Sequence, residues 1–352
     1  MGHPDIRRAA ALAIAGAVTL LAPHNRLAGQ EDFRFRSGVE LVNVTATVTD
    51  RSGHFVAGLT QADFTVYEDD RPVDVTHFSA ERVPVSLGIV LDTSGSMAGD
   101  KIGNARAAIE RFLDQLLDPD DEVFLYGFAN DVQRIHDWTT NREALSASLR
   151  RMRAVGGTAM YDAVVETVPI AQGGRNLKKA VILISDGNDT NSRTGMRDVR
   201  QVVRETEVLV YAVGIDGEGQ PTIRVRPPGT PIPFPIPGRR RPRMPWPLLP
   251  QFPPTTGRTR AADPLNVAAL REITDESGGR TEVVRDGRDL DRATGSIADE
   301  LSKQYYLGYS SVGHRDGRWH TIRVELRDGS LRVRARRGYL ATSSPAMSGQ
   351  PG

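Results

Sequence analysis

The chain has 352 residues, of which 39% are hydrophobic, and its formal net charge at pH 7 is +1. That length is enough for a packed core, and the near-neutral charge gives no reason to expect a nucleic-acid partner. There is no cysteine, which excludes disulfides, thiol catalysis, lipidation at a cysteine and cysteine-ligated zinc.

The first segment, residues 1–29, is predicted to be a signal peptide. Arg7 and Arg8 precede an apolar stretch, 9–22, which has signal-peptide length and is too short to cross a bilayer comfortably. An uncleaved anchor is the alternative. No second hydrophobic run of spanning length follows in the sequence, so we expect no membrane span in the mature chain. The expected location is the periplasm, the cell envelope or the outside of the cell.

Residues 30–82 are predicted to form an N-terminal β-unit similar to a small sandwich. Apolar and polar side chains alternate over 42–48, which is the period of a half-buried strand. Residues 63–68 and 73–78 are typical of further short strands, with a turn at Asp69-Asp70 between them. No group of residues here suggests chemistry, so we expect a scaffold or spacer role.

An α/β domain is predicted to begin at residue 83, with its first part spanning 83–218, because strand and helix patterns alternate there. Its first strand, 85–91, is almost entirely apolar, which is typical of a strand buried on both faces of a mainly parallel sheet. The elements that follow are expected to be helix 102–116, strands 122–128 and 132–138, helices 143–152 and 161–170, strand 180–186, helix 196–204 and strand 208–214.

Residues 219–262 differ in composition from the rest of the chain. They contain thirteen of its 22 prolines and eight arginines, but no acidic residue. Proline removes backbone donors, so this insert cannot form a sheet or a long helix. We expect a polyproline-like surface loop or a disordered segment. The alternative is a contact surface for an acidic partner or an anionic envelope polymer.

The α/β domain is expected to resume over 263–303 and to be followed by a C-terminal β-unit, 304–342, and a disordered tail, 343–352. Asp328-Gly329 is a hairpin turn signal within the β-unit. The elements expected in these segments are helix 266–276, strand 281–284, helix 290–301 and strands at 304–309, 319–326 and 331–339.

Polar side chains that follow the first buried strand are candidate metal ligands. Asp92, Ser94 and Ser96 are two residues apart, so in an extended loop their oxygens point the same way. Gly95 lets the backbone bend tightly between the serines. Three hard oxygen groups suit a small hard cation such as Mg²⁺. Taken alone, the pattern is a weak signal, because a serine or aspartate before a helix is usually just an N-cap.

Two later stretches complete a larger pattern. Thr158 lies on a glycine loop before a predicted helix, and Asp186 ends a second buried strand. Together with the three side chains above, they resemble the metal-ion-dependent adhesion site (MIDAS) of von Willebrand factor type A (VWFA) domains. The resemblance spans about 83–216 and continues from 263. With its two β-units, the chain is similar to a bacterial exported VWFA-related family. It implies a Rossmann-like α/β domain, with a mainly parallel sheet flanked by helices.

The resemblance implies a site for Mg²⁺ or Mn²⁺. In the family, the serine hydroxyls and usually the threonine hydroxyl contact the metal, and the two aspartates often act through water. Such neutral ligands leave an open position that attracts a carboxylate, so the implied partner is a protein that offers a Glu or Asp side chain. Asp92 and Asp186 both end strands, and open α/β sheets bind ligands at that edge. We therefore expect a non-enzymatic adhesion or assembly module.

Two other functions remain open, namely a structural envelope scaffold with a vestigial or merely stabilising metal site, and a metal-dependent hydrolase. A serine hydrolase is disfavoured because Ser94 lies in Asp-Thr-Ser-Gly rather than in a Gly-x-Ser-x-Gly elbow. None of the seven histidines stands in a recognisable motif, and no phosphate loop occurs. Nothing in the sequence indicates an oligomeric state.

Overall fold

The computed structural model of the chain describes residues 39–115, 117–186, 189–216, 265–312 and 316–341. The predicted signal peptide, the proline-rich insert and the C-terminal tail lie outside the described residues. Within the described ranges, no helix has both the length and the hydropathy needed to cross a membrane.

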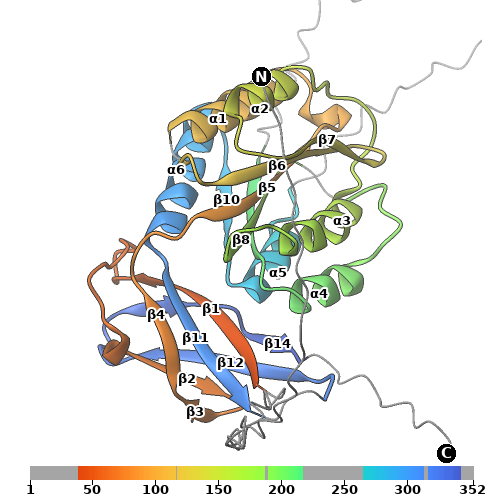
Figure 1. The fold of residues 1–352 in the computed structure, drawn as a ribbon. Helices are drawn as coiled ribbons and strands as arrows, with labels where there is room; N and C mark the ends of the chain where they lie inside the picture. Colours follow the sequence, from red (N-terminus) through yellow and green to blue (C-terminus); the bar gives the residue numbers. More distant parts are fainter. Residues whose placement is uncertain (1–38, 116, 187–188, 217–264, 313–315, 342–352) are drawn as a thin grey trace, which may run out of the picture. The chain divides into compact units, whose positions relative to one another are not determined.

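A six-stranded sheet with the order β10-β9-β8-β5-β6-β7 forms the centre of the α/β domain (Figure 1). Neighbouring strands run parallel from β10 to β6, and β7 pairs antiparallel with β6. The predicted, mainly parallel sheet is therefore confirmed. The strands are β5 Val85–Asp92, β6 Glu122–Phe128, β7 Val132–Thr139, β8 Lys178–Ser185, β9 Leu209–Ile215 and β10 Thr281–Val284.

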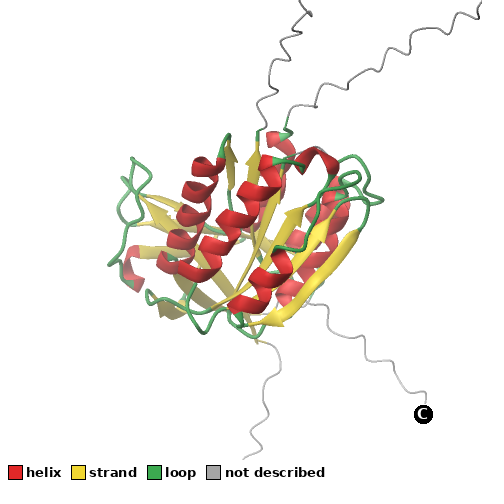
Figure 2. Ribbon diagram, turned by 90° about the horizontal axis from the view of Figure 1, so that it is seen from above, coloured by secondary structure: helices red, strands yellow, loops and turns green. Residues whose placement is uncertain are grey.

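Helices cover both faces of this sheet (Figure 2). Successive side chains of a strand point to opposite faces, so Ile89 and Leu91 pack with α1, α2 and α6, whereas Val90 packs with α3, α4 and α5. All eight residues of β5 are buried, as the apolar run predicts. The helices are α1 Asp100–Gln115, α2 Arg142–Leu149, α3 Met160–Gln172, α4 Met196–Arg204, α5 Val267–Ser277 and α6 Gly287–Lys303.

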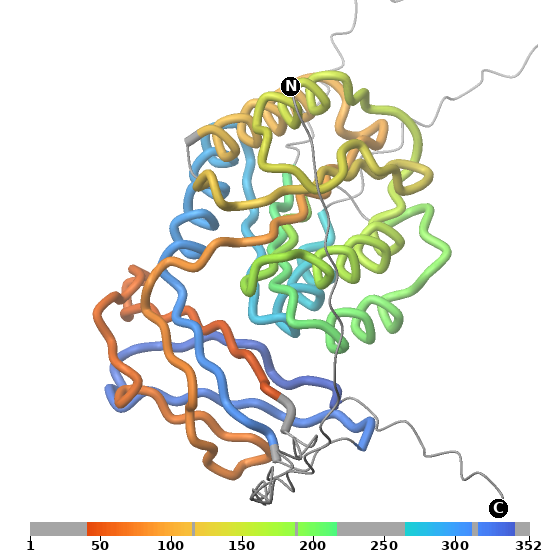
Figure 3. Tube along the Cα trace, viewed as in Figure 1, coloured from red at the N-terminus to blue at the C-terminus, as the bar shows by residue number. Residues whose placement is uncertain are grey.

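The two terminal β-segments, which we expected as separate units, share two four-stranded sheets. One sheet has the order β13-β1-β11-β4 and the other β14-β12-β2-β3. Figure 3 shows the N-terminal β1 in red beside the C-terminal β11 in blue. The strands are β1 Val39–Thr49, β2 Phe64–Glu68, β3 Arg71–Val73, β4 Val75–Ser79, β11 Tyr305–Val312, β12 Trp319–Leu326, β13 Arg332–Arg334 and β14 Gly338–Leu340.

Sharing the sheets gives the terminal segments one hydrophobic core. Val44 and Val66 from the N-terminal segment are buried in the same cluster as Leu307 and Ile322 from the C-terminal segment. A short strand stabilises a sheet only by packing against neighbours, so neither segment could bury its apolar side chains alone. The two segments are thus one structural unit built from both sides of the α/β domain in the sequence.

Two turns of this β structure were predicted from the sequence, and only one of the two predictions is confirmed. Asp69 and Asp70 have φ values of 46° and 62° and join β2 to β3, so the predicted turn is confirmed. The hairpin predicted at Asp328-Gly329 is wrong, because the strands on either side do not pair with each other. Strand β12 pairs with β14 and β2, and β13 pairs with β1. Since β12 has a neighbour on each edge, the chain crosses to the other sheet.

A buried polar network connects the last helix of the α/β domain to this β structure. The carboxylate of Glu300 on α6 is fully buried. It accepts hydrogen bonds from Thr47 on β1 and Tyr211 on β9, each at 2.9 Å, and from the Arg280 side chain at 2.6 Å. Arg334 on β13 completes the network with an ion pair. One carboxylate therefore forms ion pairs with two guanidinium groups and accepts hydrogen bonds from two hydroxyls.

Candidate metal centre

Asp92 and the serines after it lie on a loop that is held rigidly at the end of β5. Asp92 is the last residue of β5, and its Oδ1 accepts a 2.8 Å hydrogen bond from the N–H of Ser94. A short 3-10 helix, Gly95–Met97, follows, and its Met97 side chain is fully buried in the core. The N–H of Gly95 donates to the carbonyl of Gly156 at 2.9 Å. The loop is thus fixed by the strand, the core and a second loop.

Four of the five predicted site side chains lie in one chain of contacts. The hydroxyl oxygens of Ser94 and Ser96 are 3.0 Å apart. Ser96 donates to Oδ1 of Asp186 at 2.7 Å, although the two residues are 90 positions apart in the sequence. Asp92 adjoins this group through Ser94 and through Ser185, whose hydroxyl donates to Oδ2 of Asp92 at 2.5 Å. The carboxyl ends of β5 and β8 therefore bring four oxygen-bearing side chains together.

Thr158 joins this group through its loop rather than through its side chain. Its backbone N–H donates to the hydroxyl of Thr190 at 3.0 Å, and its carbonyl accepts from the N–H groups of Thr190 and Asn191. Among the described residues, the Thr158 hydroxyl forms no hydrogen bond with the other four site side chains. The hydrogen bond from the N–H of Gly95 to the carbonyl of Gly156 links the serine loop to the loop that carries Thr158.

The centre combines two buried aspartates with one exposed serine. Burial raises the pKa of Asp92 to about 6; the hydrogen bonds from Ser185 and Ser94 oppose this rise, and the charge of Asp186 adds to it. Asp92, Ser94 and Asp186 are buried, whereas Ser96 is exposed. A cation that reached the centre would therefore contact it from the side of Ser96.

The spacing of the oxygens fits a Mg²⁺ ion. In an octahedral site with metal–oxygen distances of about 2.1 Å, neighbouring oxygens lie about 3.0 Å apart. The Ser94–Ser96 separation of 3.0 Å matches this edge, and the Ser96–Asp186 separation of 2.7 Å is close to it. Within the described ranges, no three His, Cys, Asp or Glu side chains gather as ligands. A site here depends on serine hydroxyls, which are hard oxygen donors.

Lys101 is a residue of this centre that the sequence analysis does not single out. Its ammonium group forms an ion pair with Oδ2 of Asp186. The lysine belongs to the first turn of α1, where the helix dipole disfavours a positive charge. That unfavourable position is the one signal in the sequence that could have suggested a carboxylate partner.

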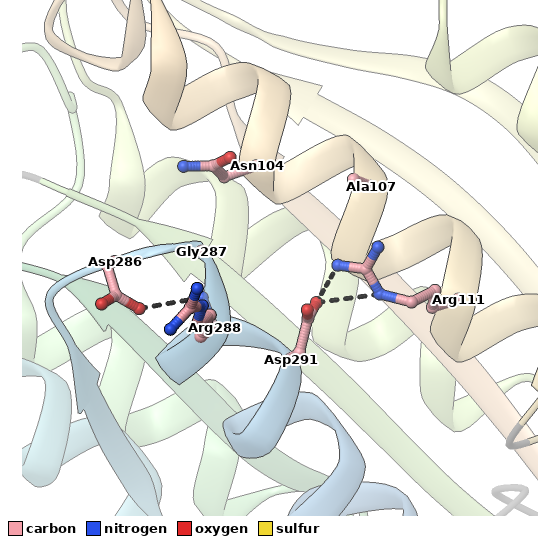
Figure 4. A pocket seen from close by; sticks show the side chains of 7 residues that line it. All are labelled: Asn104, Ala107, Arg111, Asp286, Gly287, Arg288 and Asp291. Atoms are coloured by element: carbon pink, nitrogen blue, oxygen red, sulfur yellow. Dashed lines mark hydrogen bonds and ion pairs between the residues drawn. The ribbon is translucent and has the colours of Figure 1, made fainter.

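A different hollow, of about 420 Å³, lies between α1 and the start of α6 (Figure 4). Three of its charged side chains already have partners. Arg111 forms an ion pair with Asp291, and Asp286 accepts hydrogen bonds from the N–H groups of Arg288 and Asp289 at 2.8 Å. None of the residues that line this hollow belongs to the oxygen cluster, so the two sites are distinct.

No histidine in the described ranges is placed to activate a serine of the centre. Their ring nitrogens hydrogen-bond to groups outside it; the residues are His54, His77, His136 and His320. A serine nucleophile needs such a base within hydrogen-bond reach.

Comparison with known proteins finds one domain family that part of the chain matches. Residues 87–188 match the family model of the von Willebrand factor type A domain. Human inter-alpha-trypsin inhibitor heavy chain H4 is 28% identical over 149 residues, covering 39% of this chain and 16% of that protein. An uncharacterized protein of Synechocystis is 25% identical over 137 residues, covering 38% of this chain and 32% of its own length. The chain thus spans less than a third of these relatives.

Solved structures give weaker similarities. BatB from Bacteroides thetaiotaomicron has 23% identity and a TM-score of 0.44, and the match covers 62% of this chain and 98% of BatB. A von Willebrand factor type A protein from Catenulispora acidiphila has 13% identity and a TM-score of 0.45, with 89% and 76% covered. The family match over 87–188 contains all five predicted site residues. Over residues 87–188, the chain is therefore similar to the von Willebrand factor type A domain family.

Proposed function

We propose that the domain is a divalent-metal-dependent protein-binding module, which holds Mg²⁺ or Mn²⁺ and captures an acidic side chain of a partner protein. The observation that carries this proposal is the convergence of Ser94, Ser96 and Asp186. The hydroxyl oxygens of the two serines are 3.0 Å apart, and the Ser96 hydroxyl lies 2.7 Å from Oδ1 of Asp186. Three hard oxygens at this spacing suit a small divalent cation.

Each side chain has a distinct part in this proposal. Ser94 and Ser96 would contact the ion through their hydroxyl oxygens, and Thr158 would contribute from the neighbouring loop. The Ser96 hydroxyl donates a hydrogen bond to Asp186, so lone-pair density of its oxygen is left for a cation. Asp92 fixes the serine loop through the N–H of Ser94. The ion, when bound, supplies a positive charge with an exchangeable position for a carboxylate oxygen.

The proposed partner chemistry follows from charge and exposure. Hydroxyl ligands are neutral, so they leave more of the ion's charge uncompensated than carboxylate ligands would. Ser96 is exposed, and a partner's Glu or Asp side chain can therefore approach from that side. The proposed location outside the cytoplasm rests on the signal peptide predicted at 1–29, which lies outside the described residues.

A second candidate function is that of a structural scaffold whose metal site is vestigial. One observation favours it. Lys101 supplies Asp186 with a cation, so the carboxylate is already neutralised by the chain itself. The two functions differ in one measurable property, because only the binding module requires a divalent ion to hold its partner.

Titration calorimetry with MgCl₂ is expected to show one ion bound per chain, and Asp186→Ala is expected to weaken this binding by at least about tenfold. The reason is that the variant removes the carboxylate that orients the Ser96 hydroxyl, and loss of such a group commonly costs about 10–100-fold in metal affinity. Asp137→Ala is the matched control, since it removes an exposed aspartate of β7, and it should bind like the parent.

Capture of envelope proteins on the immobilised chain, with Mg²⁺ and then with EDTA, separates the two functions. The binding module should retain a partner only with Mg²⁺, and the Asp186→Ala variant should lose the same partner. Equal retention in both buffers, or calorimetry that shows no Mg²⁺ binding by the parent, would exclude the metal-dependent function.

A further inference from the structure

Lys101 occupies a position that its own helix does not explain. It is the second residue of α1, next to Asp100, and the N-terminal turn of a helix carries partial positive charge. A lysine there gains nothing from the helix dipole. Its side chain is 28% exposed, whereas that of its partner Asp186 is fully buried. The contact that accounts for the position of this lysine is therefore the ion pair with Asp186.

The two oxygens of Asp186 have different partners. Oδ1 accepts the hydrogen bond from Ser96, and Oδ2 pairs with the ammonium group of Lys101. A buried carboxylate is costly without a positive partner, and in the described ranges Lys101 is the cation that forms an ion pair with this one. Lysine and a divalent ion would thus be drawn to the same charge.

We propose that Lys101 is an internal cation of the centre, which competes with the divalent ion for Asp186 and so sets the metal affinity. This inference rests on the proposed metal-binding function. Without metal, the ammonium group keeps the buried carboxylate neutralised. Loading of the ion weakens the Lys101–Asp186 pair, and the long, partly exposed lysine stem lets the ammonium group move into solvent.

The proposal implies that the centre fills only above a threshold concentration of free divalent ion. A divalent ion has to replace an interaction that is already present, so filling the site requires a higher concentration of free ion than a preformed vacant cage of the same ligands would need. Lys101 is accordingly a residue that determines affinity, rather than a ligand.

Neutral replacement of Lys101 provides the test. We expect Lys101→Met, which keeps most of the length of the side chain, to tighten Mg²⁺ binding on the order of tenfold in calorimetry, the usual size of an effect from one group around a metal's ligands. Lys101→Gln should act in the same direction, and it serves if the methionine variant folds poorly. Lys101→Arg keeps the charge and should bind Mg²⁺ like the parent. Lys303→Met, which breaks an exposed ion pair with Asp299 on α6, is the matched control.

Thermal unfolding supplies a readout that does not depend on a partner. In EDTA, Lys101→Met should melt below the parent, because Asp186 is left buried without its cation. With saturating MgCl₂ the difference should shrink or disappear, so the metal-induced rise in Tm should be larger for the variant than for the parent. Lys303→Met should show the parental rise.

The outcomes distinguish this inference from the function on which it rests. If the parent binds Mg²⁺ and both neutral variants bind it equally or more weakly, the competition is refuted while the metal-binding function stands. If neither the parent nor the variants bind Mg²⁺, both ideas are refuted. If only the neutral variants bind it, the competition is supported and the parent chain acts as the scaffold.

Discussion

Replacing Glu300 with alanine is expected to lower the free energy of unfolding by about 3–5 kcal/mol, the usual cost of removing one partner from a buried ion pair. Glu300 is fully buried and forms ion pairs with both Arg280 and Arg334, whose side chains are 24% and 30% exposed. The variant leaves both guanidinium groups without this partner. It also leaves the hydroxyls of Thr47 and Tyr211 without their acceptor. Urea denaturation at pH 7 measures the change.

Two further variants show whether the network, rather than the helix, causes this loss. Asp299→Ala lies next to Glu300 on α6 but removes only an exposed pair with Lys303, so it should cost less than about 1 kcal/mol. Glu300→Gln keeps the volume and an acceptor oxygen and should fall between the two. A loss below about 1 kcal/mol for Glu300→Ala would mean that the arginines find other partners or water.

The central sheet was predictable because its strands are buried on both faces. A strand such as β5, in which all eight residues are buried, is apolar over most of its length, and that run is visible without any knowledge of its neighbours. Helices α1 and α6 were likewise predictable from apolar spacing, since each presents one stripe to the core. These signals are local, so a single sequence contains them.

The pairing of the terminal strands was not predictable in the same way. Alternation over 42–48 indicates that one face of β1 is buried, but it does not say which strand lies beside it. The partner, β11, begins at Tyr305, which follows the α/β domain in the sequence. No local pattern in β1 indicates that its neighbour comes from so far along the chain. The strong turn signal at Asp328-Gly329 was misleading for a related reason, because the neighbours of β12 are strands from elsewhere in the chain.

The candidate site was likewise predictable only in part from the sequence. The order and types of its side chains are local properties, and strand ends place Asp92 and Asp186 at one edge of the sheet. The contacts of Lys101 and Ser185 depend instead on how α1 and β8 pack against the serine loop. Side-chain contacts between separate elements are set by tertiary packing, so the role of Lys101 became visible only in the structure.

Replacing Asp92 with asparagine is expected to make the metal-free protein more stable at pH 7, by up to about 3 kcal/mol, the equivalent of a shift of about two pKa units. Burial raises the pKa of Asp92 from 3.8 to about 6. Between these pH values the folded state keeps a proton that the unfolded state has released, so the free energy of unfolding of the parent falls as pH rises through this window. Asparagine does not ionise, so the free energy of unfolding of the variant does not fall for this reason.

The substitution Asp92→Asn also preserves the local hydrogen bonds. The carbonyl of the introduced amide can accept from the N–H of Ser94, and its NH₂ group can donate to the hydroxyl of Ser185, so two of the contacts that Asp92 makes are kept. Urea denaturation in EDTA should therefore give similar stabilities for parent and variant near pH 4 and a gap that opens by pH 7. Asp137→Asn, at an exposed position of β7, should open no such gap.

Magnesium should reverse the order of the two proteins. An ion at about 1,000 times its Kd stabilises the parent by about 4.1 kcal/mol, which exceeds the gap of up to about 3 kcal/mol, whereas the asparagine variant, which lacks one carboxylate of the centre, should gain little. A parent that is already the more stable protein in EDTA at pH 7 would contradict this explanation, because it would mean that the buried carboxylate is stabilised without a metal. The expected reversal has one physical cause. The buried carboxylate of Asp92 destabilises the folded protein when no divalent ion is bound, and it stabilises the folded protein when an ion binds beside it.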